Sequence, residues 1–187
     1  MSQGFERAVF LDRDGVLNRA VVREGKPYPP SGAADLEIVP GAAGALAALK
    51  RAGFRLYVVT NQPDVARGTQ TRAAVEEIHA ALTGALPVDG FYVCYHDDRD
   101  RCECRKPKPG LLLAAAAEHS IALPASYLIG DRWRDIEAGQ RAGCRTAWLD
   151  FGYAEPGPRE PADFRAESLE GAAAWILQEE HNGLNRA

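Results

Sequence analysis

The stretch that decides the fold is AVFLDRDG, residues 8–15, near the start of a 187-residue chain. Its four apolar residues suit a short buried strand. Asp12 and Asp14 follow directly, and Gly15 lets the backbone turn away sharply. In an open parallel sheet the ligand crevice lies at the carboxyl ends of the strands. The segment therefore predicts a strand that delivers two carboxylates to a crevice, although aspartates in an ordinary strand-end turn would give the same pattern.

The rest of the chain alternates short apolar runs with longer stretches rich in alanine and leucine. Some of these stretches carry helix-end signals, such as Ser168 before the last one and Gly143 after another. Strands that alternate with helices imply parallel pairing, right-handed crossovers and helices on both faces of the sheet. The sequence thus predicts a doubly wound α/β domain with strands at 8–11, 56–59, 91–93, 127–129 and 146–149 and helices at 40–52, 71–82, 109–119, 132–142 and 168–180.

Composition narrows the class of protein. A chain of 187 residues that is 46% hydrophobic suits one domain over 1–187, and we expect no large cap domain between the strands. The 22 basic and 26 acidic residues give a net charge of −4, which argues against binding nucleic-acid phosphates. We see neither a membrane-spanning run nor a signal-peptide pattern. We therefore expect a cytoplasmic protein, monomeric or a small homo-oligomer, with long loops at 19–36 and 153–165.

Residues that could bind phosphate or a metal ion lie at the ends of the other predicted strands or between these strands. The second strand ends at Thr60 and Asn61 follows it; the Thr60 hydroxyl and the Asn61 amide suit the binding of a phosphoryl oxygen. Asp131 ends the fourth strand and adds a carboxylate beside Asp12, and carboxylate clusters with waters are what Mg²⁺ prefers. Lys106, just before a helix, suits neutralisation of a transferring phosphoryl group. Together these motifs predict a nucleophile, an acid/base group, a phosphate grip and a metal site.

Three cysteines and a histidine cluster in the segment 94–104. Three thiols and one imidazole match a closed tetrahedral zinc site, which leaves no position for a catalytic water. The loop between the two pairs has no apolar residue, so we expect zinc to order it, and structural zinc contributes on the order of 10–16 kcal/mol in small motifs. The alternative is three reduced cysteines and a surface histidine. The predicted ligands are Cys94, His96, Cys102 and Cys104.

The motifs FLDRDGVLN, VVTNQPDVARG, CRKPKPG and LIGD resemble those of the haloacid dehalogenase-type phosphatases, an aspartyl-phosphate superfamily with a Rossmann-like core. More narrowly, they and the cysteine–histidine loop are similar to the heptose-bisphosphate phosphatases and to their relatives, the histidinol-phosphate phosphatases. The resemblance spans roughly residues 10–149. The tail, 151–187, carries none of it and is expected to be variable.

The resemblance implies a role for each matching residue. Asp12 would be the nucleophile, and Asp14 would protonate the leaving oxygen and then activate water. Thr60 would act beside them, Lys106 would stabilise charge, and Mg²⁺ would be bound by Asp12, Asp14 through its backbone carbonyl, and Asp131. The implied substrate-binding residues are Asn61, Gln62 and Arg105, the last reaching the part of the substrate away from the reacting phosphate.

The substrate that the resemblance implies is a small phosphorylated sugar. Asn18 and the TNQPDVARG stretch favour removal of the 7-phosphate of D-glycero-D-manno-heptose 1,7-bisphosphate, in the biosynthesis of nucleotide-activated heptose. Pro63-Asp64-Val65 departs from the Ser-Gly-Ile common in that group. The alternatives are histidinol phosphate in histidine biosynthesis, transfer of the phosphoryl group to another alcohol, and a non-catalytic protein that uses its zinc loop for interaction.

Several residues have two open interpretations. Asp135 is either a partner of the metal site or an acidic residue in the first turn of its helix. Arg67 and Trp133 either help to form the site or do not. We expect Cys144 to be buried and the remaining histidines to lie at the surface, namely His79, His119 and His181.

Overall fold

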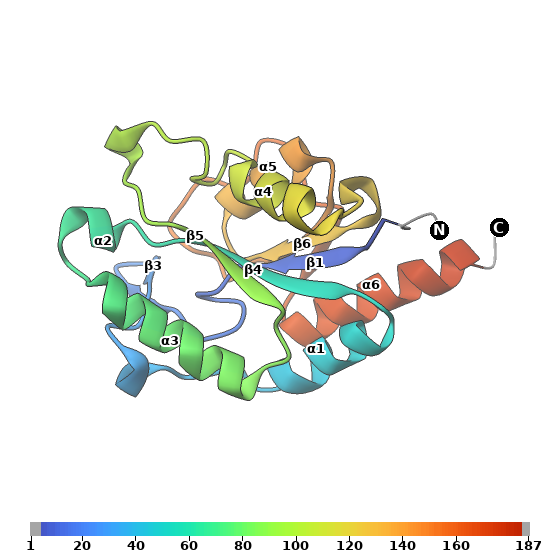
Figure 1. Ribbon diagram of the computed structural model, residues 1–187, viewed down its shortest axis with the longest axis horizontal. Coiled ribbons are helices and arrows are strands. Elements are labelled where there is room, and N and C mark those ends of the chain that lie inside the picture. The colour runs from blue at the N-terminus through green and yellow to red at the C-terminus, as the bar shows by residue number, and fades with distance from the viewer. Residues whose placement is uncertain (1–4, 185–187) are drawn as a thin grey trace.

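A six-stranded parallel sheet forms the centre of the computed structural model, which describes residues 5–184 (Figure 1). The strand order is β5-β4-β1-β6-β7-β8, so the chain starts in the middle, builds outward to one edge and then returns to fill the other. The order reverses beside β1, and such a switch point is where open α/β sheets bind ligands. The strands are β1 (Ala8–Leu11), β4 (Arg55–Asn61), β5 (Gly90–Cys94), β6 (Tyr127–Gly130), β7 (Arg145–Leu149) and β8 (Phe164–Ala166).

Helices cover both faces of the sheet (Figure 1). One face carries α4 (Gly110–His119) and α5 (Trp133–Ala142), and the other carries α1 (Ala42–Arg51), α3 (Arg72–Ala85) and α6 (Leu169–Leu184). Short helical turns occur in the connections: η1 (Ala33–Asp35), α2 (Asp64–Arg67), η2 (Asp98–Asp100) and η3 (Leu123–Ala125). This arrangement confirms the predicted doubly wound α/β fold.

The alternation of side chains along β1 divides the core in two. Val9 and Leu11 point toward the layer of α1 and α6, whereas Ala8 and Phe10 point toward α4 and α5. All four side chains are fully buried. Burial of a side chain such as leucine or phenylalanine stabilises a fold by roughly 1.5–3 kcal/mol. The strand that carries Asp12 is therefore held rigidly from both faces.

A hairpin occupies the segment predicted as a long loop at 19–36. Its strands, β2 (Val21–Arg23) and β3 (Lys26–Tyr28), pair antiparallel. The two turn residues, Glu24 and Gly25, have φ of 51° and 72°, as a two-residue hairpin turn of the primed kind requires. Sequence reasoning missed the hairpin because its strands are short and show no buried face.

The segment after Phe151 completes the fold. Its strand β8 pairs in parallel with β7, and α6 packs against α1 with Ala172 and Ile176 fully buried. Sequence reasoning also missed β8, because this strand has three residues and only one of them is buried. Within residues 5–184, none of the helices has the length and apolar character needed to cross a membrane.

Candidate active site

Three buried carboxylates meet at the carboxyl ends of β1 and β6. Asp12 follows β1, Asp131 follows β6, and Asp135 lies in the first turn of α5. An oxygen of each lies within 4.8 Å of the others, and the three residues are at most 7% exposed. Like charges at this separation in a dry site repel one another. The three carboxylates can therefore be ionised together only if nearby positive charge neutralises them.

Lys106 supplies one such charge from within the protein. Its Nζ lies 2.9 Å from Asp12 Oδ1 and 2.5 Å from Asp135 Oδ1, and it donates to the carbonyl of Val59 at 2.7 Å. The backbone of Lys106 is fixed by Asn61, whose side chain accepts from its N–H and donates to its carbonyl, both at 3.1 Å. The peptide bond that follows Lys106 is cis. A lysine that is 2% exposed is thus held against the predicted nucleophile.

Burial and mutual repulsion set the protonation of this cluster. Burial, followed by the charge of Asp135, raises the pKa of Asp12 to about 6 against the opposing effect of Lys106. Burial likewise raises the pKa of Asp131 well above its ordinary value, with Asp12 and Asp135 adding to the effect. Burial works to lower the pKa of Lys106, but the two neighbouring carboxylates outweigh it and raise that pKa. Lys106 is therefore a permanent cation in this site.

Asp131 shows that the site suits a metal ion. Both of its carboxylate oxygens are buried, and among the described residues neither makes a hydrogen bond of normal geometry, although the Tyr153 hydroxyl is near enough to oppose the rise in the pKa of Asp131. A Cβ at Gly15, where φ is +88°, would come within 1.9 Å of Asp131 Oδ2, so the missing side chain leaves room for this carboxylate beside the turn. Unpaired, buried carboxylate oxygens fit a hard cation such as Mg²⁺.

The Asp14 carboxylate accepts hydrogen bonds from three side chains of the protein interior. Arg13 donates from Nε to both carboxylate oxygens at 3.1 and 3.2 Å and from Nη2 to Oδ2 at 2.9 Å. Asn18 and Gln62 donate to the same carboxylate at 3.0 and 2.8 Å. Gln62 also donates to Thr60 Oγ1 at 2.9 Å and is fully buried. Gln62 thus joins Thr60 to Asp14 behind the site.

A cavity of about 350 Å³ opens above these groups. Asp12, Asp14, Thr60 and Lys106 lie along its lining, and residues 26–29 of the hairpin form part of its wall. Outside the carboxylate cluster, the rest of its lining carries more basic than acidic side chains: those of Lys26, Arg67, Arg105, Arg132 and Arg134 against those of Asp64, Asp98 and Glu155. A cavity with carboxylates and a lysine on one side and an excess of basic side chains around the rest suits a substrate that carries more than one anionic group.

Several of the basic groups are paired with carboxylates of the protein itself. Arg105 Nε donates to Asp98 Oδ1 at 2.8 Å, and Arg134 Nη1 lies 3.6 Å from the same oxygen. Arg132 pairs with Glu155. The Asp98 side chain is 56% exposed, and ion pairs with an exposed partner contribute little, so a substrate anion can replace this carboxylate.

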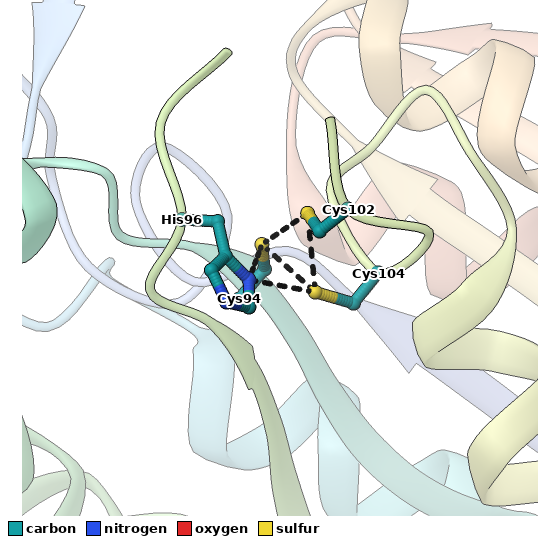
Figure 2. A group of neighbouring side chains, drawn as sticks. All are labelled: Cys94, His96, Cys102 and Cys104. Carbon is teal, nitrogen blue, oxygen red and sulfur yellow. Dashed lines mark hydrogen bonds between the residues drawn. The ribbon is translucent and has the colours of Figure 1, made fainter. Parts of the chain in front are cut away.

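The predicted zinc ligands converge in a second cluster, on the loop that leads into Arg105 (Figure 2). The three sulfur atoms lie 3.1–3.7 Å apart, and His96 Nδ1 lies 3.2 and 3.7 Å from the sulfur atoms of Cys104 and Cys94. Burial raises the pKa of the Cys94 thiol. Three sulfurs and one imidazole nitrogen within 4.8 Å fit a tetrahedral zinc ion.

The structure also places the residues that sequence reasoning left open or misplaced. Asp135 lies in the first turn of α5, where one oxygen faces Lys106 and the other accepts from the Arg132 N–H at 3.0 Å. Arg67 lies in the cavity wall, whereas Trp133 does not. The surface position expected for His79 is wrong, because the residue is 8% exposed and packs against Phe91. The sequence of the helix gave no indication that Phe91 of β5 would cover His79.

Comparison with known proteins agrees with this geometry. The HAD-hydrolase-like family model matches residues 103–172. The chain is 37% identical over 182 residues to an Escherichia coli K12 protein named D-glycero-beta-D-manno-heptose-1,7-bisphosphate 7-phosphatase, covering 91% of this chain and 87% of the relative. A Helicobacter pylori J99 protein of the same name is 38% identical over 144 residues, covering 73% and 78%.

Solved structures give the same result. The D,D-heptose 1,7-bisphosphate phosphatase from B. bronchiseptica, complexed with magnesium and phosphate, matches with a TM-score of 0.74 and 29% identity over 92% of this chain and 99% of that one. A HAD-like phosphatase from Mesorhizobium loti matches with a TM-score of 0.73 and 27% identity over 94% and 87%. The chain belongs to the HAD-like hydrolases and, among them, to the family of the heptose-1,7-bisphosphate 7-phosphatases.

Proposed function

We propose that this protein is a Mg²⁺-dependent phosphatase that removes the 7-phosphate of D-glycero-D-manno-heptose 1,7-bisphosphate through an aspartyl-phosphate intermediate. The observation that carries the proposal is the buried Lys106 ammonium 2.9 Å from Asp12, beside two further carboxylates at the switch point of the sheet. The names of the relatives support this substrate and favour its beta anomer. The cytoplasmic location expected from the sequence stays a prediction.

In the first step an oxygen of Asp12 attacks the phosphorus atom of the substrate. A bond forms between Asp12 and phosphorus while the bond to the sugar oxygen breaks, and the departing oxygen takes a proton from Asp14. In the second step Asp14 accepts a proton from a water molecule whose oxygen attacks phosphorus, which frees Asp12 and inorganic phosphate. A covalent intermediate divides a very slow hydrolysis into two easier steps.

The remaining site residues bind charge in this scheme. Lys106 neutralises Asp12 and the phosphoryl group, and Thr60 and Asn61 are proposed to hold phosphoryl oxygens beside Gln62. Mg²⁺ held by Asp12, Asp131 and the backbone carbonyl of Asp14 would neutralise the charge on the phosphoryl oxygens.

Zinc bound by the second cluster would be structural. Its four protein ligands, Cys94, His96, Cys102 and Cys104, would fill a tetrahedral coordination shell and hold the loop that carries Asp98 and leads into Arg105. The expected consequence of zinc loss is a misplaced Arg105.

The basic wall of the cavity bears on the choice of substrate. Arg105, with the arginines around it, suits the second phosphate of a sugar bisphosphate. Histidinol phosphate carries an ammonium group instead, which a basic wall repels. The wall therefore favours the bisphosphate over that alternative. Transfer of the phosphoryl group to an alcohol would use the same first step.

Phosphate release by the purified protein with Mg²⁺ tests the proposal, with both anomers of heptose 1,7-bisphosphate and histidinol phosphate as substrates. We expect kcat/KM for a heptose anomer to exceed that for histidinol phosphate about 100-fold, which corresponds to roughly 2.7 kcal/mol of transition-state binding. The reverse preference would overturn the substrate, and the absence of release from all three would support a non-catalytic role for the zinc loop. Asp12→Asn is the negative control.

A further inference from the structure

Arg13 stands between the two aspartates of the site, and its side chain is fully buried. Its Nε and Nη2 face Asp14, as described above. The remaining nitrogen, Nη1, lies 3.1 Å from Nε2 of His79. A buried guanidinium is costly unless its N–H groups are paired. Asp14 and His79 between them provide a partner for each nitrogen of this guanidinium.

His79 is oriented for this contact by its own packing. It lies in α3, and its ring stacks on Phe91 of β5 with the centroids 4.4 Å apart and the planes at 21°. Because a guanidinium only donates, Nε2 of His79 must accept, which places the proton of the neutral ring on Nδ1. Burial and then the charge of Arg13 lower the pKa of His79 to about 4, so the ring is neutral and able to accept near pH 7.

We propose that His79 is a positioning residue for the reaction, which acts through Arg13 to hold the carboxylate of Asp14 in the orientation needed for proton transfer. This inference rests on the acid/base function proposed for Asp14. His79 itself does not line the cavity, so it is not expected to touch the substrate.

The physical argument concerns what happens when the acceptor is lost. Arg13 Nη1 would then be buried without a partner, and the guanidinium would turn to find one. Asp14 would lose the two-nitrogen contact that fixes its plane and would keep the single contacts from Asn18 and Gln62. Proton transfer depends steeply on placement, so the reaction would slow without any change in the groups that bind the substrate.

Two substitutions separate the acceptor from the ring. His79→Phe keeps a ring to stack on Phe91 but removes the acceptor, whereas His79→Gln keeps an acceptor without the ring. His119→Phe is the matched control, because His119 also stacks on an aromatic ring, that of Tyr57 at 4.8 Å, in a different part of the fold. Thermal unfolding of each variant shows whether it is folded.

The readout is kcat/KM for two substrates that differ in their need for an acid. Heptose 1,7-bisphosphate releases an alkoxide, which needs a proton, whereas p-nitrophenyl phosphate releases a stable phenolate, which does not. Because kcat/KM includes only the steps up to departure of the leaving group, hydrolysis of the intermediate does not obscure the comparison.

We expect His79→Phe to lower kcat/KM for the sugar phosphate about ten-fold more than for the aryl phosphate, a part of the 10²–10⁴-fold that general acid catalysis contributes. His79→Gln should recover most of this loss, and the control should match the wild type. Equal losses on both substrates, or a Gln variant as selective in its loss as the Phe variant, would overturn the positioning role.

Two further variants complete the test. Should His79→Phe not fold, Arg13→Lys takes its place, because an ammonium cannot contact Asp14 and His79 in the same two-sided way and should give the same selective loss. Asp14→Asn separates this inference from the proposed function. If Asp14→Asn slows both substrates equally, the acid role of Asp14 has failed; if it is selective and the His79 variants are not, only the inference about His79 has failed.

Discussion

Gly15→Ala is predicted to destabilise the protein and weaken its binding of Mg²⁺. Gly15 has a φ of +88°, and an alanine in this left-handed region costs about 1–2 kcal/mol. The added Cβ would also lie 1.9 Å from Oδ2 and 2.5 Å from Cγ of Asp131, a buried side chain that can move only by displacing its neighbours. Overpacking of this kind costs about 1–3 kcal/mol, which gives a combined loss of roughly 2–5 kcal/mol.

Gly68→Ala is the control that separates the backbone cost from the cost of overpacking against Asp131. Gly68 has a similar φ of +73°, but a Cβ there would meet nothing within 4 Å, so only the backbone cost of about 1–2 kcal/mol applies. Urea denaturation of the metal-free variants measures both losses of unfolding free energy. Calorimetric titration with Mg²⁺ should show affinity reduced at least ten-fold, or about 1.4 kcal/mol, in the Gly15 variant alone. Equal losses of stability and unchanged Mg²⁺ affinity would show that this turn does not accommodate a metal-binding Asp131.

Three other predictions concern the zinc loop, the cavity wall and the carboxylate cluster. Cys102→Ser should abolish zinc binding, measured by elemental analysis, and lower both Tm and activity. Cys144→Ser, at a buried thiol outside the cluster, should keep its zinc. Unchanged metal content and melting in the Cys102 variant would contradict the zinc assignment. Asp98→Asn frees Arg105 and Arg134 and should lower KM for the bisphosphate about two- to five-fold, which is the contribution of an exposed ion pair. Glu103→Gln, in the same loop, should leave KM unchanged. Equal KM values for the Asp98 variant and the wild type would show that Asp98 does not compete with the substrate. Because the pKa of Asp12 rises from 3.8 to about 6 on folding, the folded metal-free protein between these pH values retains a proton that the unfolded chain has lost. The free energy of unfolding should therefore decline as pH rises from about 4 to 6. A series of urea denaturation curves without metal that shows no such decline would refute this prediction.

Much of the sheet was predictable from the sequence. Each central strand has a short apolar run buried on both faces, and the polar residues at the carboxyl ends of β1, β4 and β6 had to meet because parallel strands end at one edge. The same rule places Asp12 beside Asp131 on the strength of sequence order and strand pairing. The cluster of Cys94, His96, Cys102 and Cys104 was equally accessible, because its ligands are close in sequence.

Other features depended on contacts between distant segments. The β2–β3 hairpin has short, mostly exposed strands, so it left no hydrophobic pattern to detect. The pairing of Asp135 with Lys106 depends on how the first turn of α5 approaches the loop before α4, which spacing alone does not determine. His79 was misplaced because the residues that bury it, Arg13 and Phe91, come from other elements.

Family and residue roles follow from different kinds of observation. Family membership rests on similarity over most of the chain, whereas the roles of individual residues rest on geometry. Lys106 joins the two, because its ammonium lies 2.9 Å from Asp12, the proposed nucleophile, where it can neutralise a phosphoryl group. The chemical identity of the nucleophile is therefore the decisive point.

Rapid acid quenching with heptose bisphosphate labelled with ³²P at the 7-phosphate determines whether Asp12 becomes phosphorylated. We expect protein-bound label within the first turnover, lability of that label at alkaline pH, and its location by peptide mapping to Asp12. Asp12→Asn should carry no label and release no phosphate. Turnover of the wild-type protein with label on another residue, or full activity of Asp12→Asn, would contradict the proposed mechanism.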